Sequence, residues 1–259
     1  MLATLFSRSL GARRIVLACI AAAALTAPSE GRAQTLTVEE VIERVEANRT
    51  HDTSRSRVRM TIRDRFGERE SMMTSWTQGA YLTLIEFTSV AERGQKILRT
   101  EDEVYLFYPD AAELIRLQGA ALRESLLGSD VSYEDLTGGR TLLDTYDATL
   151  EGRETLEGHD VYRVSLRARR RNVAYPRQTL WVDADMFVVR RAEQYSLNGR
   201  LLKTIEAEDI RRIDGINVPM RQTISDALKR NSSTSVEIEE LEIGLALSND
   251  LFSLEELSW

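Results

Sequence analysis

The sequence contains few of the residue types that carry out covalent and metal chemistry. Its 259 residues include one cysteine, two histidines and four prolines. The cysteine, Cys19, lies in a segment that we expect to be removed on export, which would leave no disulfide, thiol nucleophile or thiolate metal ligand. Neither His51 nor His159 lies in a motif with a nucleophile and an orienting carboxylate. We therefore expect no enzymatic activity, no metal site and no cofactor.

Long apolar runs are also scarce. After residue 33 no stretch is long enough to span a bilayer, which takes about 20 residues. Residues 1–33 have the pattern of an export signal, because a stretch with three arginines precedes an apolar run over 15–27, and residues 31–33 offer small side chains to a signal peptidase. Cleavage would leave residues 34–259, which we interpret as a single domain in the periplasm.

Positive charge is in deficit. Without the four arginines and one glutamate of the predicted signal, the chain keeps 30 basic and 40 acidic groups, a net charge of −10. This balance argues against nucleic acid as a partner and against unspecific adsorption to anionic lipid surfaces. We expect a monomer whose stability comes from its core alone.

The remaining chain predicts one helix followed by many strands. Apolar residues recur at helical spacing over 38–45, and Thr37 with Glu40 has the capping-box pattern of a helix start. Alternation of apolar and polar residues then predicts ten or more short strands joined by tight turns, as in an antiparallel sandwich or barrel. The predicted strands cover residues 57–63, 72–76, 81–87, 96–100, 104–108, 162–166, 179–182, 187–195, 201–210, 218–224 and 235–241.

The middle of the chain interrupts this pattern. Gly119–Gly128 predicts a short helix, with Leu122 and Leu126 on one side and Gly128 positioned to end it. Residues 129–136 and 141–144 predict one or two further short helical turns, in which acidic groups near a helix start have capping as their usual role.

Two strands are apolar on both faces. In strands 81–87 and 104–108, apolar residues occupy successive positions instead of alternate ones. One face could meet the helices while the other lines a pocket or a contact surface. Alternatively, both faces are buried in a sandwich or under a helix. The sequence leaves both interpretations open.

Two charged clusters have ordinary explanations. Residues 167–171 carry four arginines, which could meet lipid phosphates or an acidic partner, although a charged hairpin tip is the usual role of such a cluster. Asp183-Ala184-Asp185 lacks the glycine and the bidentate glutamate of a calcium loop. It lies between two predicted strands, so we interpret it as a hairpin turn.

The run from Leu126 to Leu136 resembles a segment of the outer-membrane lipoprotein-sorting protein family, which is related to the periplasmic carrier LolA. The matches continue in order from about residue 37 to the chain end. The flanking matches are Leu84–Ser89, Trp181–Asp183, Asp214-Gly215, Val218-Pro219 and Asp250–Leu254. The resemblance implies one lipoprotein-sorting domain over 34–259: an unclosed antiparallel β-barrel whose concave face is covered by the N-terminal helix and a short helical insertion.

The resemblance also implies an apolar cavity that holds lipid or lipoprotein acyl chains during transfer between membranes. The residues that would line it are Met60, Ile62, Met72, Trp76, Tyr81, Ile85, Phe87, Leu106 and Tyr108, with Leu122 and Leu126 forming a lid. No arginine can be matched by motif to the one that latches the lid in LolA itself. An inner-membrane RND-type transporter is the expected protein partner. The alternative function is a non-carrying periplasmic adaptor that docks on such a lipid exporter.

Overall fold

The computed structural model describes residues 36–257 except 102, 138–140 and 172. The predicted signal segment, Cys19 and Gly138-Gly139 therefore lie outside the described residues. Residues 36–259 form one compact unit. Among the helices of the described part, none is long and apolar enough to cross a membrane.

Helix α1 (Val38–Ala47) forms where the sequence predicts it. The Thr37 hydroxyl accepts a hydrogen bond from the Glu40 backbone N–H at 3.2 Å, and the Glu40 carboxylate accepts one from the Thr37 N–H at 2.8 Å, so the predicted capping box is confirmed. In its apolar stripe Val41, Ile42 and Val45 are buried against the sheet, and Val38 is half-buried at the edge of the same cluster.

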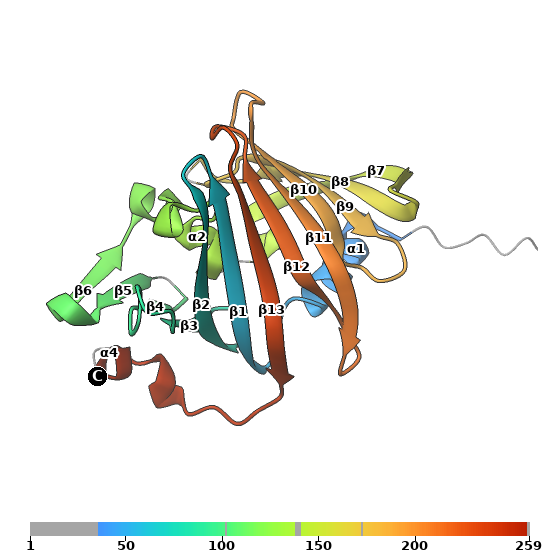
Figure 1. Cartoon of the computed structure of the whole chain (residues 1–259). Helices are drawn as coiled ribbons and strands as arrows, with labels where there is room; N and C mark the ends of the chain where they lie inside the picture. The colour runs from blue at the N-terminus through green and yellow to red at the C-terminus, as the bar shows by residue number, and fades with distance from the viewer. Residues whose placement is uncertain (1–35, 102, 138–140, 172, 258–259) are drawn as a thin grey trace, which may run out of the picture. The chain divides into compact units, whose positions relative to one another are not determined.

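Thirteen strands in the described residues form one antiparallel sheet (Figure 1). They are β1 (Thr53–Asp64), β2 (Gly67–Gln78), β3 (Leu82–Phe87), β4 (Lys96–Arg99), β5 (Val104–Tyr108), β6 (Glu113–Leu117), β7 (Tyr146–Leu156), β8 (His159–Ala168), β9 (Arg177–Asp183), β10 (Val189–Tyr195), β11 (Leu201–Ile213), β12 (Ile216–Asp226) and β13 (Ser233–Ile243). Their order is β6-β5-β4-β3-β2-β1-β13-β12-β11-β10-β9-β8-β7. Because β6 and β7 are the two edges, the sheet is an unclosed barrel, which confirms the predicted fold class.

One face of the sheet is continuous across most of its width. The strand register places Ile62, Thr234, Ile224, Ile205, Ala192, Leu180 and Val164 in a single row from β1 to β8. We call this face the inner face. It carries two apolar clusters: one beneath α1 and one beneath the insertion between β6 and β7.

The other face of the sheet, the outer face, is largely charged. Arginines and glutamates of neighbouring strands alternate there, as in the pairs Arg57–Glu240 and Arg221–Glu237. Trp181 lies between Arg163 and Arg191, with ring-to-guanidinium distances of 5.9 and 5.6 Å. Because successive residues of a strand point to opposite faces, the alternation of apolar and charged residues makes the inner face apolar and the outer face charged.

The insertion differs from the single helix predicted over 119–128. The short helices there are η2 (Gly119–Arg123), η3 (Leu126–Gly128), α2 (Tyr133–Thr137) and α3 (Leu142–Thr145). The chain is extended at Ser125 because Ser125 forms a β-bridge with Ser132, and the Leu126 N–H donates to the Val131 carbonyl at 2.8 Å. These local bonds compete with a continuous helix and divide it into two 3₁₀ turns.

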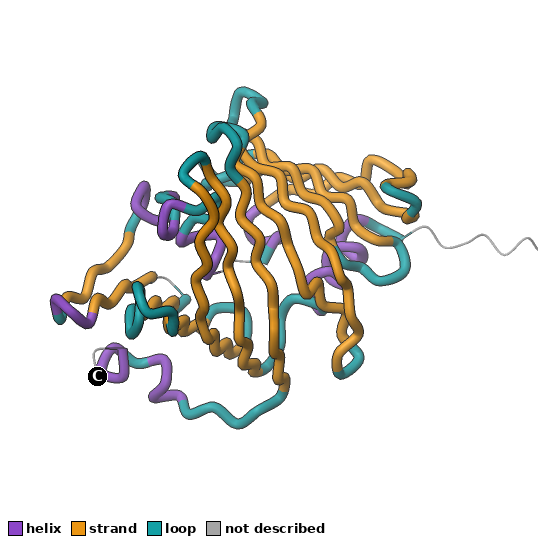
Figure 2. Tube along the Cα trace, in the orientation of Figure 1, coloured by secondary structure: helices purple, strands orange, loops and turns teal. Residues whose placement is uncertain are grey.

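The strands that are apolar on both faces are buried on both faces. Residues 247–257, which include η4 (Asn249–Phe252) and α4 (Leu254–Leu257), cover the outer face of β3 to β5. Phe252 and Leu257 pack there on Leu84, Leu98 and Phe107. Figure 2 shows this C-terminal segment running back beneath these strands. The chain's own end therefore occupies the surface that the sequence left open as a pocket or a contact.

Candidate functional site

The apolar inner face of β1 to β5 is closed by a lid, which we define as residues 119–137. The lid contributes Leu126, which is 1% exposed, together with Leu122, Leu127, Tyr133 and Leu136. These side chains pack on inner-facing residues of the strands, which are Val58, Met60, Ile62, Met73, Ile85, Phe87, Ile97, Val104 and Leu106. The lid side chains therefore cover the inner-face residues to which, by the family resemblance, acyl chains would bind.

Eight of the eleven residues predicted to line a cavity lie in this cluster. They are Met60, Ile62, Ile85, Phe87, Leu106, Tyr108, Leu122 and Leu126. Met72 and Trp76 share a face, as expected, but it is the outer face, and Met73 takes the inward position in β2. Tyr81 lies in the turn before β3. A shift of one residue in a strand reverses its face, so the period alone did not separate Met72 from Met73.

Asp130 attaches the lid to β13 and to the turn before it. Its buried carboxylate accepts hydrogen bonds from the Ser232 hydroxyl at 2.8 Å and from the Thr234 hydroxyl at 3.0 Å. The Asp130 backbone N–H donates to the Thr234 hydroxyl at 2.9 Å. Thr234 interrupts the apolar row of the inner face, so it provides a polar attachment point in the middle of the sheet.

Asp135 makes a second attachment, to β11 and to the loop before β9. It accepts from the Lys203 ammonium and from the Tyr175 hydroxyl at 2.9 Å. Burial and then the neighbouring Asp135 charge raise the pKa of Tyr175, which keeps this hydroxyl a donor. Asp135 also has the predicted capping role: it accepts from the Ser132 N–H at 2.9 Å, and its own N–H donates to the Ser132 hydroxyl at 3.2 Å.

Two cations bind lid carbonyls. The Arg69 guanidinium in β2 donates to the Leu127 carbonyl at 2.9 Å. The Lys229 ammonium, in the turn between β12 and β13, donates to the carbonyls of Gly128 and Ser129 and to the Ser125 hydroxyl. The sequence did not point to Arg69 or Lys229 as groups that hold the lid, because both residues come from segments distant in sequence from it.

Inside the cluster, polar atoms are few and shielded. Burial raises the pKa of Tyr133 to about 12, and the adjacent Tyr108 adds to the effect. Burial also raises the pKa of the Glu134 carboxyl, against the opposing influence of Arg123. The lid therefore turns mostly apolar side chains toward β1 to β5, and its polar contacts with the sheet lie around them.

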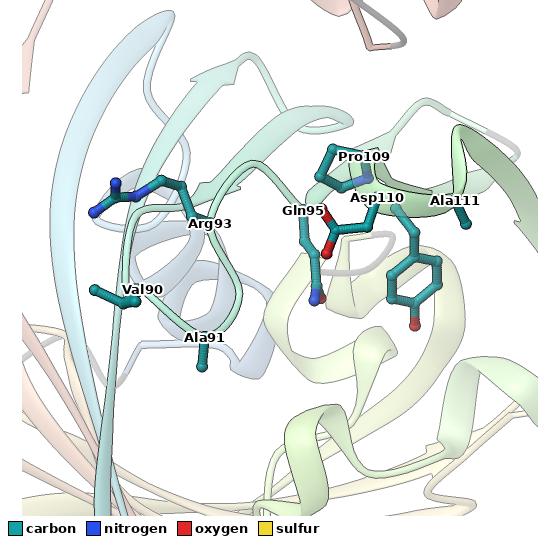
Figure 3. A pocket seen from close by; sticks show the side chains of 8 residues that line it. Val90, Ala91, Arg93, Gln95, Pro109, Asp110 and Ala111 are labelled. Atoms are coloured by element: carbon teal, nitrogen blue, oxygen red, sulfur yellow. The ribbon is translucent and has the colours of Figure 1, made fainter.

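Two surface pockets are separate from the buried residues of this cluster, although the half-buried Tyr108 borders the first. One, of about 400 Å³, separates the 90–95 loop from the 109–111 turn and includes Arg93 and Asp110 (Figure 3). The other, of about 500 Å³, lies over β7 to β10 and is lined by charged and hydroxyl side chains such as Asp147 and Arg167. The first pocket mixes charged and small apolar side chains and the second is lined mostly by polar ones, so neither has the predominantly apolar lining that an acyl chain needs.

Groups suited to metal binding do not cluster in the described residues, where no three His, Cys, Asp or Glu side chains converge. Asp183-Ala184-Asp185 forms the turn between β9 and β10, which confirms the hairpin interpretation. The candidate site in the described part of the chain is therefore the apolar inner face of β1 to β5, covered by a lid that polar contacts hold in place.

Comparison with known proteins agrees with this architecture. A family model with the description "-like: Uncharacterized protein" matches residues 79–259. Among curated proteins, none matches the chain. A DUF1329 family protein from Desulfovibrio piger is 24% identical, with a TM-score of 0.79 over 86% of this chain and 100% of that one.

Two further solved structures have the same fold. A domain named for outer membrane lipoprotein sorting, from Vibrio parahaemolyticus, is 18% identical with a TM-score of 0.78, over 86% of this chain and 98% of that one. A LolA superfamily protein from Nitrosomonas europaea is 25% identical with a TM-score of 0.73, over 86% of this chain and 100% of that one. The resemblance inferred from residues 126–136 is confirmed. This chain therefore belongs to the family of the matching model, and it has the fold of the LolA-like, outer-membrane lipoprotein-sorting proteins.

Proposed function

We propose that this protein is a periplasmic carrier that binds lipid or lipoprotein acyl chains on the inner face of β1 to β5 after the lid moves away. One observation carries the proposal: the lid contributes apolar side chains to this face, yet its attachments to the sheet are polar side-chain contacts. An acyl chain can replace the lid's leucines, and the polar contacts can re-form with water. Residues 1–33 would act as the export signal, and the chain would bind rather than catalyse.

The energetics are compatible with exchange. Each CH₂ group transferred from water to an apolar surface contributes about 0.8 kcal/mol, so eight to ten groups contribute roughly 6–8 kcal/mol. Removing the lid costs the burial of a few leucines, about 1.5–3 kcal/mol each, and the buried Lys203–Asp135 pair. The two quantities are similar in size, as a carrier that both loads and releases requires.

A reversible crosslink between lid and sheet tests the proposal. The double variant Asp130→Cys/Thr234→Cys, made in a Cys19→Ser background, joins the two positions whose atoms lie 2.9–3.0 Å apart. We expect the oxidised protein to bind a fluorescent long-chain phospholipid at least tenfold more weakly than the reduced protein. Titration of delipidated protein, with and without dithiothreitol, measures this.

The matched control is Ser54→Cys/Thr77→Cys, which crosslinks β1 to β2 at a directly paired position away from the lid. Its lipid binding should be the same in both redox states. If the reduced lid variant and the unmodified protein both refuse lipid while remaining folded, the carrier proposal is wrong. The non-carrying adaptor on an RND-type exporter then becomes the better proposal, and crosslinking in the native envelope would identify its partner.

A further inference from the structure

Three neighbouring turns stand at one end of the sheet. They are residues 65–66 between β1 and β2, 196–200 between β10 and β11, and 227–232 between β12 and β13. The register brings them together, because Arg63 pairs with Ser233, and the Ala227 N–H donates to the Leu202 carbonyl at 2.8 Å. Figure 1 shows the three turns side by side at the top of the sheet. We call them the tip surface.

Each turn exposes one large apolar side chain. Phe66 is 83% exposed, Leu197 is 72% exposed and Leu228 is 51% exposed. They are three of the six large apolar side chains that are exposed in the described residues. Three exposed large apolar side chains among the thirteen residues of these turns are unusual, because turns are ordinarily built from small polar residues.

The tip surface is also basic. Its turns contain Arg65, Arg200, Lys229 and Arg230 and no acidic residue. Lys229 binds the lid, whereas the three exposed arginines form no ion pair with a carboxylate of the described residues. At the opposite end of the sheet, the turns 157–158, 184–188 and 214–215 carry three acidic residues and no basic one.

We propose that the tip surface docks on the surface of an anionic phospholipid bilayer. Exposed arginines bind lipid phosphates, and protruding Phe and Leu side chains enter the boundary between headgroups and acyl chains. Three separate protruding apolar side chains suit a bilayer surface better than a protein partner, because a stable protein interface needs a contiguous patch of about 800 Å². The net negative charge of the chain opposes unspecific adsorption, so docking is oriented: only this end faces the membrane.

Docking also places the lid beside the bilayer. The 227–232 turn that carries Leu228 and Arg230 carries Lys229 as well, whose ammonium holds the lid carbonyls of Gly128 and Ser129. The membrane contact is inferred from exposure and charge alone and does not depend on which cargo the inner face binds.

Sedimentation with vesicles tests the inference on the purified protein. We expect binding to vesicles of 40% phosphatidylglycerol in phosphatidylcholine at low salt, and much weaker binding to pure phosphatidylcholine. Neutralising the three tip arginines (Arg65→Gln/Arg200→Gln/Arg230→Gln) should weaken binding about 100-fold, since each basic residue near the surface contributes about fivefold. The triple change Phe66→Ser/Leu197→Ser/Leu228→Ser should weaken it as well.

The control removes the same charge elsewhere. Arg153→Gln/Arg211→Gln/Arg212→Gln alters exposed arginines near the opposite turns and should change binding less than threefold. An environment-sensitive dye on Phe66→Cys, in a Cys19→Ser background, should shift to the blue on anionic vesicles, whereas the same dye on Leu114→Cys in the edge strand β6 should not. No binding of the unmodified protein at low salt would overturn the inference. An equal loss of vesicle binding in the control variant would overturn it as well. So would a dye on Phe66→Cys that shows no blue shift while the protein is bound to vesicles.

Discussion

Asp183 illustrates how one residue closes a turn and stays ionised inside the fold. It is 4% exposed, and its carboxylate accepts hydrogen bonds from the backbone N–H groups of Asp185 at 3.0 Å and Met186 at 2.8 Å. The Arg190 guanidinium donates to it at 2.6 Å. Burial acts to raise the pKa of Asp183, but these three donors outweigh it, so the pKa is lowered.

The first prediction concerns this carboxylate. Because its folded-state pKa lies below the unfolded value of about 3.9, the charge stabilises the fold above that pH, and the contribution is lost as pH falls through the folded-state pKa. We expect Asp183→Asn to lower the free energy of unfolding by about 2–4 kcal/mol at pH 7. The difference from the unmodified protein should shrink at pH 2–3. Urea unfolding at both pH values measures it.

Asp209→Asn is the matched control, because Asp209 forms its ion pair with Arg211 on the surface. Its effect should be negligible at both pH values, because an exposed ion pair contributes little to stability. If the loss for Asp183→Asn is the same at pH 7 and pH 2.5, the cause is the shape of the amide rather than the lost charge, and the prediction is wrong.

At the scale of elements, the C-terminal segment acts as a cover. Without it, the outer face of β3 to β5 would present Leu84, Leu98 and Phe107 to water. Phe252, 7% exposed, lies in this segment and contacts that face. The ending Asp250–Leu254, which contributed to the family resemblance, thus has a packing role.

We expect Phe252→Ala to lower the free energy of unfolding by about 3–4 kcal/mol, because a large buried aromatic side chain leaves a cavity. The variant should also bind the dye ANS, since the outer face of β3 to β5 becomes accessible. Leu114→Ala, in the exposed edge strand β6, serves as a control and should change stability by less than about 1 kcal/mol. Equal stability of the two variants would show that the segment is only loosely attached.

At the scale of the whole sheet, the two inner clusters meet at a weak seam. β12 and β13 pair only over 221–224 and 234–237, although both strands are eleven residues long. Residues 216–220 of β12 pair with β11, and residues 238–243 of β13 pair with β1. The sheet therefore divides at one end, between the α1 cluster and the lid cluster.

Hydrogen exchange should detect this seam. In β12 the seam offers no unbonded amide at two alternate positions, because Pro219 has no N–H and the Asn217 N–H donates to the Asn48 side chain at 3.0 Å. Within 238–243 of β13, we expect the alternate amides that point toward the seam to exchange at least tenfold faster than the amides of the paired segment 234–237. Amides of 238–243 that point to β1 provide the internal control. Uniform protection along β13 would contradict the seam.

Most of the local structure of this protein follows from short-range patterns in its sequence. The capping box at Thr37 and Glu40 located α1, and alternation located eleven of the strands, because both depend on neighbours within a few residues. Strands β6 and β7, rich in exposed residues at the edges of the sheet, gave too little alternation to be predicted. The run Leu126–Leu136 marked the lid through its family resemblance.

Contacts between groups that are distant in the chain become visible only in the folded protein. A period of two does not tell which face points inward, so Met73 lies on the inner face where Met72 was predicted. The pairing of Lys203 with Asp135, the cover over β3 to β5 and the grouping of Phe66, Leu197 and Leu228 at one end join residues far apart in the chain. Such contacts depend on strand order and register, which are set by the packing of the whole sheet and not by any segment alone.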